Sequence, residues 1–366
     1  MSDSLKYKIA LTLIPHIGDV LAKKLLAYCG SAEQVFKEKR SALEKIPGIG
    51  TAYAQAVLHH SIFDRAEEEM QFIHHHSIQP VFYQDTTYPK RLSYCDDSPV
   101  MLYFKGNADL NMRKIISIVG TREATGYGKD ICDKLIQELS MHDVLIVSGL
   151  AYGIDTHAHR AALDNHLPTV CVLAHGLDKI YPSANRSIAL KMLESGGWLS
   201  DFISGTKPDR ENFPRRNRIV AGISDATIVI ESKAKGGSLI TADIANSYHR
   251  DVFAFPGRTD DACSAGCNTL IKQHKAALIQ SAADVIYLLG WEQANSAKAP
   301  VQKQLFIDLK PEEEVIVNLL KEKNQLPIDD ICLLSNLSMS KVSSLLLTLE
   351  FSGLIKSLPG KIYRFN

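Results

Sequence analysis

Short apolar runs alternate with segments of helical periodicity along the middle of the chain. Five such runs, rich in β-branched residues, lie at 115–119, 144–147, 169–173, 226–230 and 251–255. Buried strands that alternate with helices indicate a parallel sheet covered on both faces. The pattern therefore predicts an α/β fold over residues 76–290, of the extended Rossmann-like type with a doubly wound parallel sheet.

The segment after each predicted strand is rich in glycine, serine and charged residues. These segments lie at 120–125, 148–155, 175–178, 231–238 and 256–258. In open parallel sheets, ligands bind beyond the carboxyl ends of the strands. Glycine lets backbone N–H groups approach a ligand closely, and helix N-termini attract anions. We therefore expect the rim of this sheet to bind phosphate.

The N-terminal region contains an internal repeat. The pattern Ile-Pro-x-Ile-Gly begins at Ile14 and recurs at Ile46. Each copy predicts a helix, a tight hairpin and a second helix, with glycine taking the positive φ of the turn. Residues 1–75 thus resemble a tandem helix-hairpin-helix (SAM-like) domain, whose hairpin amides often contact nucleic-acid phosphates. A helical packing module without a ligand is equally consistent, because few basic residues flank the hairpins.

The C-terminal region predicts a winged helix. Residues 291–304 lack periodicity and are expected to form a linker. In residues 305–366, three short helices at 311–320, 328–334 and 338–350 precede a hairpin, which is the order of a winged-helix domain. The last helix carries one basic residue, Lys341, so docking of a protein partner is at least as consistent as DNA reading. Residues 74–111 predict only an irregular collar.

Composition narrows the class of protein. The chain of 366 residues has a formal net charge of zero, so a nucleic-acid partner would have to be held by a local patch. Residues 207–218 form one such patch, with five basic and two acidic side chains, although a solvated face has the same composition. The seven scattered cysteines and the polar start favour a reduced, cytoplasmic chain.

Signatures of cofactors and metals are weak. The glycines at 120, 126 and 128 do not match the dinucleotide fingerprint, and no Gly-Lys-Ser/Thr phosphate loop occurs, so NAD and ATP are not expected. The histidines at 74–76 and at 157 and 159 lack the spacing of a metal set, and Cys263 and Cys267 lack a second pair. We expect no cofactor and no metal.

The candidate phosphate-binding residues come from four segments of the predicted rim. Guanidinium groups match phosphate oxygens, and a helix start with two glycines and a serine forms an anion cradle. Phe213 is expected either to stack on a base or to serve as a hydrophobic staple for the helix that it opens. The candidates are Gly120, Thr121, Arg122, Lys179, Phe213, Arg215, Arg216, Asn217, Arg218, Lys235, Gly236, Gly237 and Ser238.

Taken together, these motifs resemble the bacterial DNA-processing protein A (DprA/Smf) family. The matching runs cover the α/β region in order: Val119-Gly-Thr-Arg122, 148–155, Gly176-Leu-Asp178 with Tyr181-Pro182, Phe213-Pro-x-Arg-Asn-Arg-Ile219, Gly236-Gly-Ser-Leu239, and Pro256-Gly257 followed by Gly266-x-Asn268. One departure is His274-Lys275, where the family pattern leads us to expect Gly-Ala.

The resemblance implies a cytoplasmic homodimer that binds single-stranded DNA at the candidate residues. It further implies that the protein loads the recombinase RecA onto that DNA, in natural transformation and recombination, without turnover chemistry. The rival class is an enzyme, because the same sheet resembles nucleotide phosphoribohydrolases. Asp243 would then replace the catalytic glutamate of that group, although the order of Gly and Glu in its loop is missing here.

Overall fold

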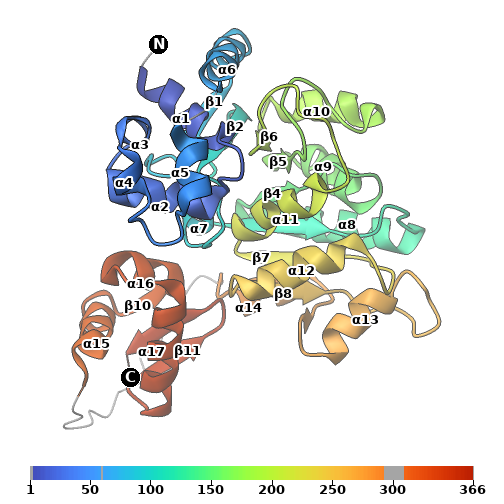
Figure 1. Ribbon diagram of the computed structural model, residues 1–366. Helices are drawn as coiled ribbons and strands as arrows, with labels where there is room; N and C mark the ends of the chain where they lie inside the picture. Colours follow the sequence, from blue (N-terminus) through green and yellow to red (C-terminus); the bar gives the residue numbers. More distant parts are fainter. Residues whose placement is uncertain (1–2, 59–60, 292–308, 366) are drawn as a thin grey trace. The chain divides into compact units, whose positions relative to one another are not determined.

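The computed structural model describes residues 3–58, 61–291 and 309–365. Contacts within the chain divide it into two compact units, Met1–Leu278 and Ile279–Asn366, which are described separately (Figure 1). The expected linker at 291–304 lies almost entirely outside the described residues. The boundary expected at residue 290 differs from this division, because helix α14 (Ala282–Leu288) belongs to the second unit.

A nine-stranded sheet forms the centre of the first unit. Its strand order is β1-β2-β6-β5-β4-β3-β7-β8-β9, and the strands from β6 to β9 in this order run parallel. The five expected strands are confirmed within one residue at each end. They are β3 (Ile115–Val119), β4 (Leu145–Ser148), β5 (Thr169–Val172), β7 (Ala226–Val229) and β8 (Asp251–Ala254).

Four further strands escaped the sequence pattern. They are β1 (Gln79–Phe82), β2 (Met101–Gly106), β6 (Gly197–Ser200) and β9 (Ala277–Leu278). The first two form an antiparallel extension from β6, where an irregular collar was expected. Strand β6 is preceded and opened by glycines, which usually signal a turn. Here a side chain at Gly197 would lie 2.6 Å from the Phe104 ring, so close approach of neighbouring strands requires the glycine.

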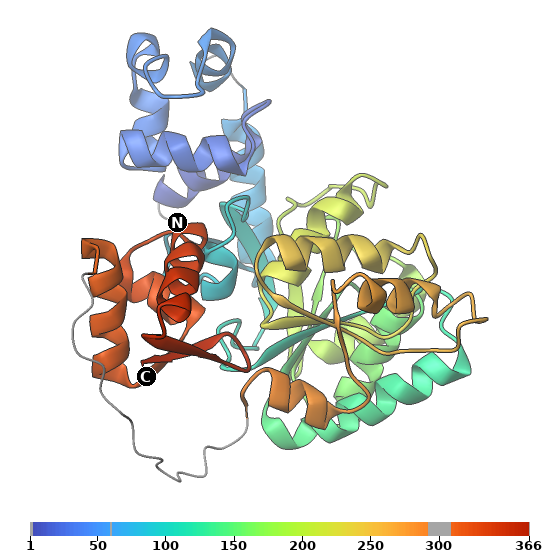
Figure 2. The same cartoon turned by 90° about the horizontal axis from the view of Figure 1, so that it is seen from below.

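Helices cover both faces of the sheet. Helices α8 (Gly126–Leu139) and α9 (Ile154–Asp164) pack together, as do α11 (Asn212–Gly222) and α12 (Gly237–Ser247). Figure 2 shows the two pairs on opposite faces. Helices α10 (Arg186–Met192) and α13 (Ala265–Lys272) and the short α7 (Lys90–Ser93) complete this part. The predicted doubly wound α/β fold is confirmed.

The order of the strands creates a switch point. From β3 the chain moves outward through β4, β5 and β6, and then returns to place β7 on the other side of β3. The carboxyl ends of β3 and β7 therefore lie side by side, while their connections leave in opposite directions. In doubly wound sheets this is the position at which ligands bind.

The N-terminal helices form the predicted tandem hairpins. Helices α1 (Asp3–Leu13) and α2 (Asp19–Cys29) make the first, and α4 (Arg40–Leu43) and α5 (Thr51–Leu58) the second; α3 (Ala32–Lys37) and α6 (Phe63–His75) complete the module. Each turn is closed by a backbone hydrogen bond: the Ile17 N–H donates to the Ile14 carbonyl, and the Ile49 N–H donates to the Ile46 carbonyl. The positive φ falls on the third residue of each motif, His16 (64°) or Gly48 (87°). The expectation that glycine takes it is confirmed for the second copy and wrong for the first, where Gly18 has φ −83°.

The helical module shares its hydrophobic core with one face of the sheet. Side chains alternate between the two faces along each strand, so Tyr103 packs with the helical module and Phe104 packs in the core of the other face. Polar contacts join the same parts, because the Asp19 carboxylate accepts a hydrogen bond of 2.9 Å from the Val100 N–H. The α2 end of the first hairpin is thus attached to the sheet.

The second unit contains the predicted winged helix. Helices α15 (Pro311–Lys323), α16 (Ile328–Ser335) and α17 (Met339–Phe351) precede the hairpin of β11 (Ile355–Leu358) and β12 (Ile362–Phe365), and β10 (Gln325–Pro327) pairs with β12. Lys341 forms an ion pair of 2.5 Å with Glu312. None of the described helices is by itself long and apolar enough to cross a membrane, whereas the bent pair of α16 and α17 together meets the criteria of length and composition.

Candidate nucleic-acid interface

The turn after β3 is held at the switch point by backbone hydrogen bonds. The Thr121 N–H donates to the Glu231 carbonyl at 2.8 Å, and the Thr121 carbonyl accepts from the Ile154 N–H at 3.1 Å. Gly153, with φ 78°, packs against this turn, and a side chain there would lie 2.2 Å from the Thr121 carbonyl oxygen. The loops after β3, β4 and β7 therefore form one connected rim.

Buried Glu231, which follows β7, holds the loop that follows β3. Its side chain accepts hydrogen bonds from the Thr125 N–H (3.0 Å) and the Thr125 hydroxyl (2.5 Å), while the Thr125 oxygen caps α8 by accepting from the Gly128 N–H at 3.1 Å. This carboxylate is 1 % exposed. It braces the loop that carries Arg122, and its burial separates it from any substrate at the rim.

Arg122 is the exposed cation at the centre of the rim. Its guanidinium carbon lies 5.6 Å from the centre of the Phe213 ring, and the Tyr181 ring centre lies 6.3 Å from that of Phe213. Phe213 is half-buried, in the first turn of α11. The loops after β3 and β5 and the start of α11 thus bring a cation and two aromatic rings together.

Three further candidate cations are accessible. Arg215 is exposed, with its guanidinium carbon 5.4 Å from the Phe202 ring centre. Lys179 is partly exposed and forms an ion pair of 3.1 Å with Asp178. Lys235 is exposed in the loop before α12. Each of these three side chains can reach a polyanion without being withdrawn from the protein core.

The cradle at α12 differs from its expected form. Gly236 is the N-cap residue, and no side chain caps the helix, so the N-terminal end is available to an anion. The Ser238 side chain is buried, however, and its hydroxyl donates to the Ser232 hydroxyl at 2.9 Å. The serine therefore stabilises the loop, and only backbone groups of the expected cradle face outward. The glycine at position 120 is likewise required by packing inside the protein, because a side chain there would lie 2.5 Å from Ile154.

Arg216 is a buried structural residue. It is 4 % exposed, and one of its terminal nitrogens donates to the Gly149 carbonyl at 2.6 Å and to the Val172 carbonyl. Its Nε donates to the Asn217 side chain at 3.2 Å. The guanidinium therefore joins the ends of β4 and β5 beneath the rim, which corrects the expectation that it meets a phosphate directly.

Buried Asp155 lies beside Arg216. Burial raises the pKa of the Asp155 carboxyl to about 6, while the Arg216 charge and hydrogen bonds from backbone N–H groups oppose the rise. Gly153 is the N-cap residue of α9, and Asp155 lies within the first turn of that helix. Asp155 and Arg216 thus form a buried, tightly packed charged pair beneath the rim.

The Arg218 guanidinium also forms its contacts inside the protein. Its Nη2 lies 2.9 Å from an Asp19 carboxylate oxygen and 2.8 Å from an Asp201 oxygen, and Nη1 donates to the Asp97 carbonyl. The side chain is 12 % exposed. This corrects the expectation that Arg218 binds a phosphate. Arg218 instead connects helix α2 of the N-terminal module with the α/β part.

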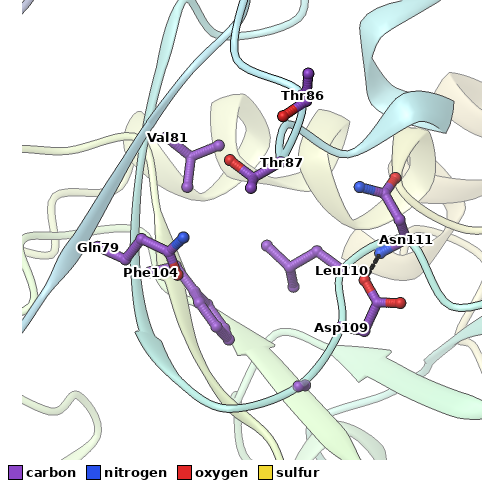
Figure 3. Close-up of a pocket in the computed structure, with 9 residues that line it drawn as sticks. Gln79, Val81, Thr86, Thr87, Phe104, Asp109, Leu110 and Asn111 are labelled. Carbon is purple, nitrogen blue, oxygen red and sulfur yellow. Dashed lines mark hydrogen bonds between the residues drawn. The ribbon is translucent and has the colours of Figure 1, made fainter.

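A pocket of about 260 Å³ lies elsewhere in the first unit (Figure 3). Val81, Phe104 and Leu110 surround its centre, and Gln79 and Asn111 lie near its margin. The loop after β2 contributes to it, and Gly106 at the end of β2 pairs with Gly197 at the start of β6. The pocket therefore borders the amino edge of the parallel strands, opposite the rim described above.

Comparison with known proteins identifies the relatives of this chain. Residues 79–290 match the family described as DNA recombination-mediator protein A, and residues 299–361 match the DprA winged helix domain. The chain belongs to the DNA recombination-mediator protein A family. The resemblance deduced from the rim motifs is thereby confirmed.

Members of this family resemble the chain over most of its length. Protein Smf of Synechocystis sp. is 32% identical over 98% of both chains. DNA processing protein DprA of Streptococcus pneumoniae is 44% identical over 55% of this chain and 71% of that protein. The crystal structure of the latter has a TM-score of 0.67, with 35% identity over 77% of this chain and 96% of its own.

A second solved structure concerns a DNA-binding relative. DNA processing protein A of Helicobacter pylori, whose structure addresses a unique mode of single-stranded DNA binding, has a TM-score of 0.53. It is 30% identical over 58% of this chain and 95% of its own. His274, where the family pattern leads us to expect glycine, has φ 57°, in the left-handed region that glycine adopts readily.

Proposed function

We propose that this protein binds single-stranded DNA at the carboxyl edge of its sheet and acts in DNA processing. The observation that carries the proposal is exposed Arg122 at the switch point, with its guanidinium against Phe213. Arg122, Lys179, Arg215 and Lys235 would contact phosphates, together with backbone groups at Gly236 and Gly237. The structure of the H. pylori relative, which addresses single-stranded DNA binding, supports the same ligand.

Preference for single strands follows from the kind of groups at the rim. Cations and helix N-terminal amides contact the backbone of any sequence, and aromatic rings need bases that are not already stacked in a duplex. Lys341 on α17, the helix that would enter a groove, is already paired with Glu312. The rim therefore suits a flexible strand whose bases can turn onto a protein surface.

A short oligothymidylate is expected to bind about tenfold more tightly than a duplex of equal length, because duplex bases cannot stack on the rim. Fluorescence anisotropy at several salt concentrations measures both affinities, and the single-strand affinity should fall as salt rises. Equal competition by the duplex would contradict the preference. Binding that does not respond to salt would contradict contact with phosphates.

We propose further that the protein acts as a homodimer that loads RecA onto the bound strand in the cytoplasm, without turning over a substrate. Strand β9 supports dimerisation, because it ends the sheet and its Leu278 is 47 % exposed. An exposed apolar side chain at the end of a sheet can be buried against a second copy of the chain, and twofold pairing is the commonest symmetry. Two rims in one dimer would bind a long strand with higher effective concentration.

Light scattering at micromolar concentration should give twice the chain mass of 40.5 kDa. Leu278→Glu should give the monomer, since a charge on the edge opposes pairing. The wild type should accelerate RecA assembly on single strands coated with a single-strand-binding protein. A monomeric wild type together with no acceleration by the cognate RecA would count against this proposal.

The hydrolase alternative gains no support from Asp243. This residue lies in the second half of α12, where its carboxylate forms an ion pair of 2.8 Å with Lys275. A group that replaces a catalytic glutamate should instead reach the loop that binds the phosphate. Incubation with AMP, followed by assay for free adenine, tests the alternative directly.

A further inference from the structure

Exposed aromatic side chains of the α/β part gather at one edge of the sheet. From residue 79 to 278, all of which are described, the large aromatic residues classed as exposed are Tyr127, Tyr152 and Tyr181. Each follows the carboxyl end of a parallel strand: Tyr127 after β3, Tyr152 after β4 and Tyr181 after β5. Their exposed fractions are 50 %, 51 % and 48 %. The exposed part of each ring is apolar surface that a ligand could cover.

Tyr127 differs from the other two because it has an internal role. Its hydroxyl donates to the Pro256 carbonyl at 2.8 Å, which joins the start of α8 to the loop after β8. Among the described residues, the hydroxyls of Tyr152 and Tyr181 have no such hydrogen bond. Tyr127 therefore has an internal hydrogen bond that explains its position, whereas the hydroxyls of Tyr152 and Tyr181 contribute no comparable bond to the fold.

Tyr152 is held directly beside the Arg122 turn. The next residue, Gly153, packs so closely on that turn that a side chain there would lie 2.6 Å from the Arg122 carbonyl carbon. Ile154 is hydrogen-bonded to the same turn through its N–H, at 3.1 Å from the Thr121 carbonyl. The backbone on the C-terminal side of Tyr152 is thus fixed against the turn that carries Arg122, and the Tyr152 side chain is 51 % exposed.

Tyr181 and Arg122 share a neighbour, the Phe213 ring. Its ring centre is 6.3 Å from that of Phe213, and Phe213 carries the Arg122 guanidinium at 5.6 Å. Phe213 is half-buried with these two neighbours against it, so it supports the arginine and leaves little ring surface for a base. Tyr181 and Tyr152 offer more exposed ring surface.

We propose that Tyr152 and Tyr181 are base-stacking residues, which receive bases of the strand whose phosphate contacts Arg122. This inference rests on the proposed single-stranded DNA binding. It adds the two side chains that would contact the bases, and that could do so only where the bases are unpaired. Strands β5, β4 and β3 are consecutive neighbours, so their ends span about 10 Å at about 4.8 Å per spacing. A few nucleotides cover that distance.

Stacking of this kind does not depend on base identity. Every base presents a π-face, and removal of one stacking side chain typically weakens binding about tenfold. The tyrosines would therefore favour single strands over duplexes without preferring a sequence. They would act on bases, whereas Arg122 and the lysines act on phosphates, and this difference separates the two contributions in an experiment.

The test compares two ligands: a short oligothymidylate and a strand of the same length made only of abasic sites. Tyr152→Ala and Tyr181→Ala should each bind the oligothymidylate about tenfold more weakly than wild type and bind the abasic strand equally well. Tyr152→Phe and Tyr181→Phe should retain wild-type affinity for both, because phenylalanine keeps the ring. Tyr28→Ala, which removes an exposed tyrosine of α2, is the matched control and should change neither affinity.

Each other outcome has a definite meaning. If alanine variants with wild-type thermal unfolding bind the oligothymidylate as well as wild type does, the stacking proposal is overturned and the proposed function stands. The same holds if they lose affinity for both ligands equally, since abasic strands have nothing to stack. If wild type binds neither ligand, the proposed function itself fails.

Discussion

Arg122→Ala is expected to weaken binding of single-stranded DNA by about tenfold or more, since a charge-assisted contact contributes about 1.5–3 kcal/mol. The slope of log affinity against log salt should also become shallower, by about 0.7 to 1, because one fewer phosphate is neutralised. Arg122 is exposed and lies over Phe213, so its removal affects the ligand more than the fold. Anisotropy titrations at several salt concentrations measure both quantities.

Arg160→Ala is the matched control for this prediction. Arg160 is also exposed, but it lies in the second half of α9, which leads away from the carboxyl edge. Its removal should leave affinity and slope near wild type. Arg122→Lys should keep the slope and lose part of the affinity, because lysine keeps the charge without the planar group that lies on Phe213. An unchanged slope in Arg122→Ala would exclude Arg122 as a phosphate contact.

The parts of the fold that could be predicted are those whose burial leaves a recognisable pattern of apolar residues in the sequence. Strands β3, β4, β5, β7 and β8 are buried almost throughout on both faces, so they appear as nearly continuous apolar runs. Strand β6 is equally buried, but the glycines that it needs for close approach interrupt the pattern. Strand β9 is only two residues long, too short to be distinguished from a loop.

The candidate site was predictable in place but not in detail. Strand order and glycine-rich turns indicate the carboxyl edge, and the structure brings Arg122, Tyr181 and Phe213 together there. The run from Arg215 to Arg218 shows where this reasoning stops. Residues on one helical turn point in different directions, so Arg215 reaches solvent, Arg216 lies beneath the rim and Arg218 faces Asp19.

The same limit explains the glycines of the rim. A glycine after a strand predicts access for a ligand, but contacts inside the protein select for glycine as well. Gly149 has no room for a side chain, because one would lie 2.5 Å from Arg216 and 2.6 Å from Asp155. Which of the two reasons applies depends on residues distant in sequence, and only the folded structure brings those residues together.

Arg218→Ala is expected to affect the fold rather than DNA binding, and to lower the free energy of unfolding by about 3–5 kcal/mol. The Asp201 side chain is 4 % exposed and the Asp19 side chain 20 %. Without the guanidinium, two carboxylates would face each other at the junction of α2 with the sheet, one of them buried. Urea unfolding of the full chain measures the loss.

The effect of pH distinguishes this cause from simple loss of packing. Burial raises the pKa of Asp201 above 3.8, and the Arg218 charge opposes the rise. In the variant the folded-state pKa should rise further, so the folded protein binds a proton more tightly than the unfolded chain. The destabilisation should therefore be largest at neutral pH and diminish as pH falls through the raised pKa towards 3.8.

Two further variants complete the test of Arg218. Arg218→Ala combined with Asp201→Asn should recover part of the lost stability at neutral pH, because the uncompensated buried charge is gone. Arg215→Ala, three residues earlier on α11, removes an exposed arginine and should unfold near wild type. If the Arg218→Ala protein is as stable as wild type but binds DNA with a shallower salt slope, Arg218 contacts phosphate after all, and its ion pairs with Asp19 and Asp201 contribute little to the fold.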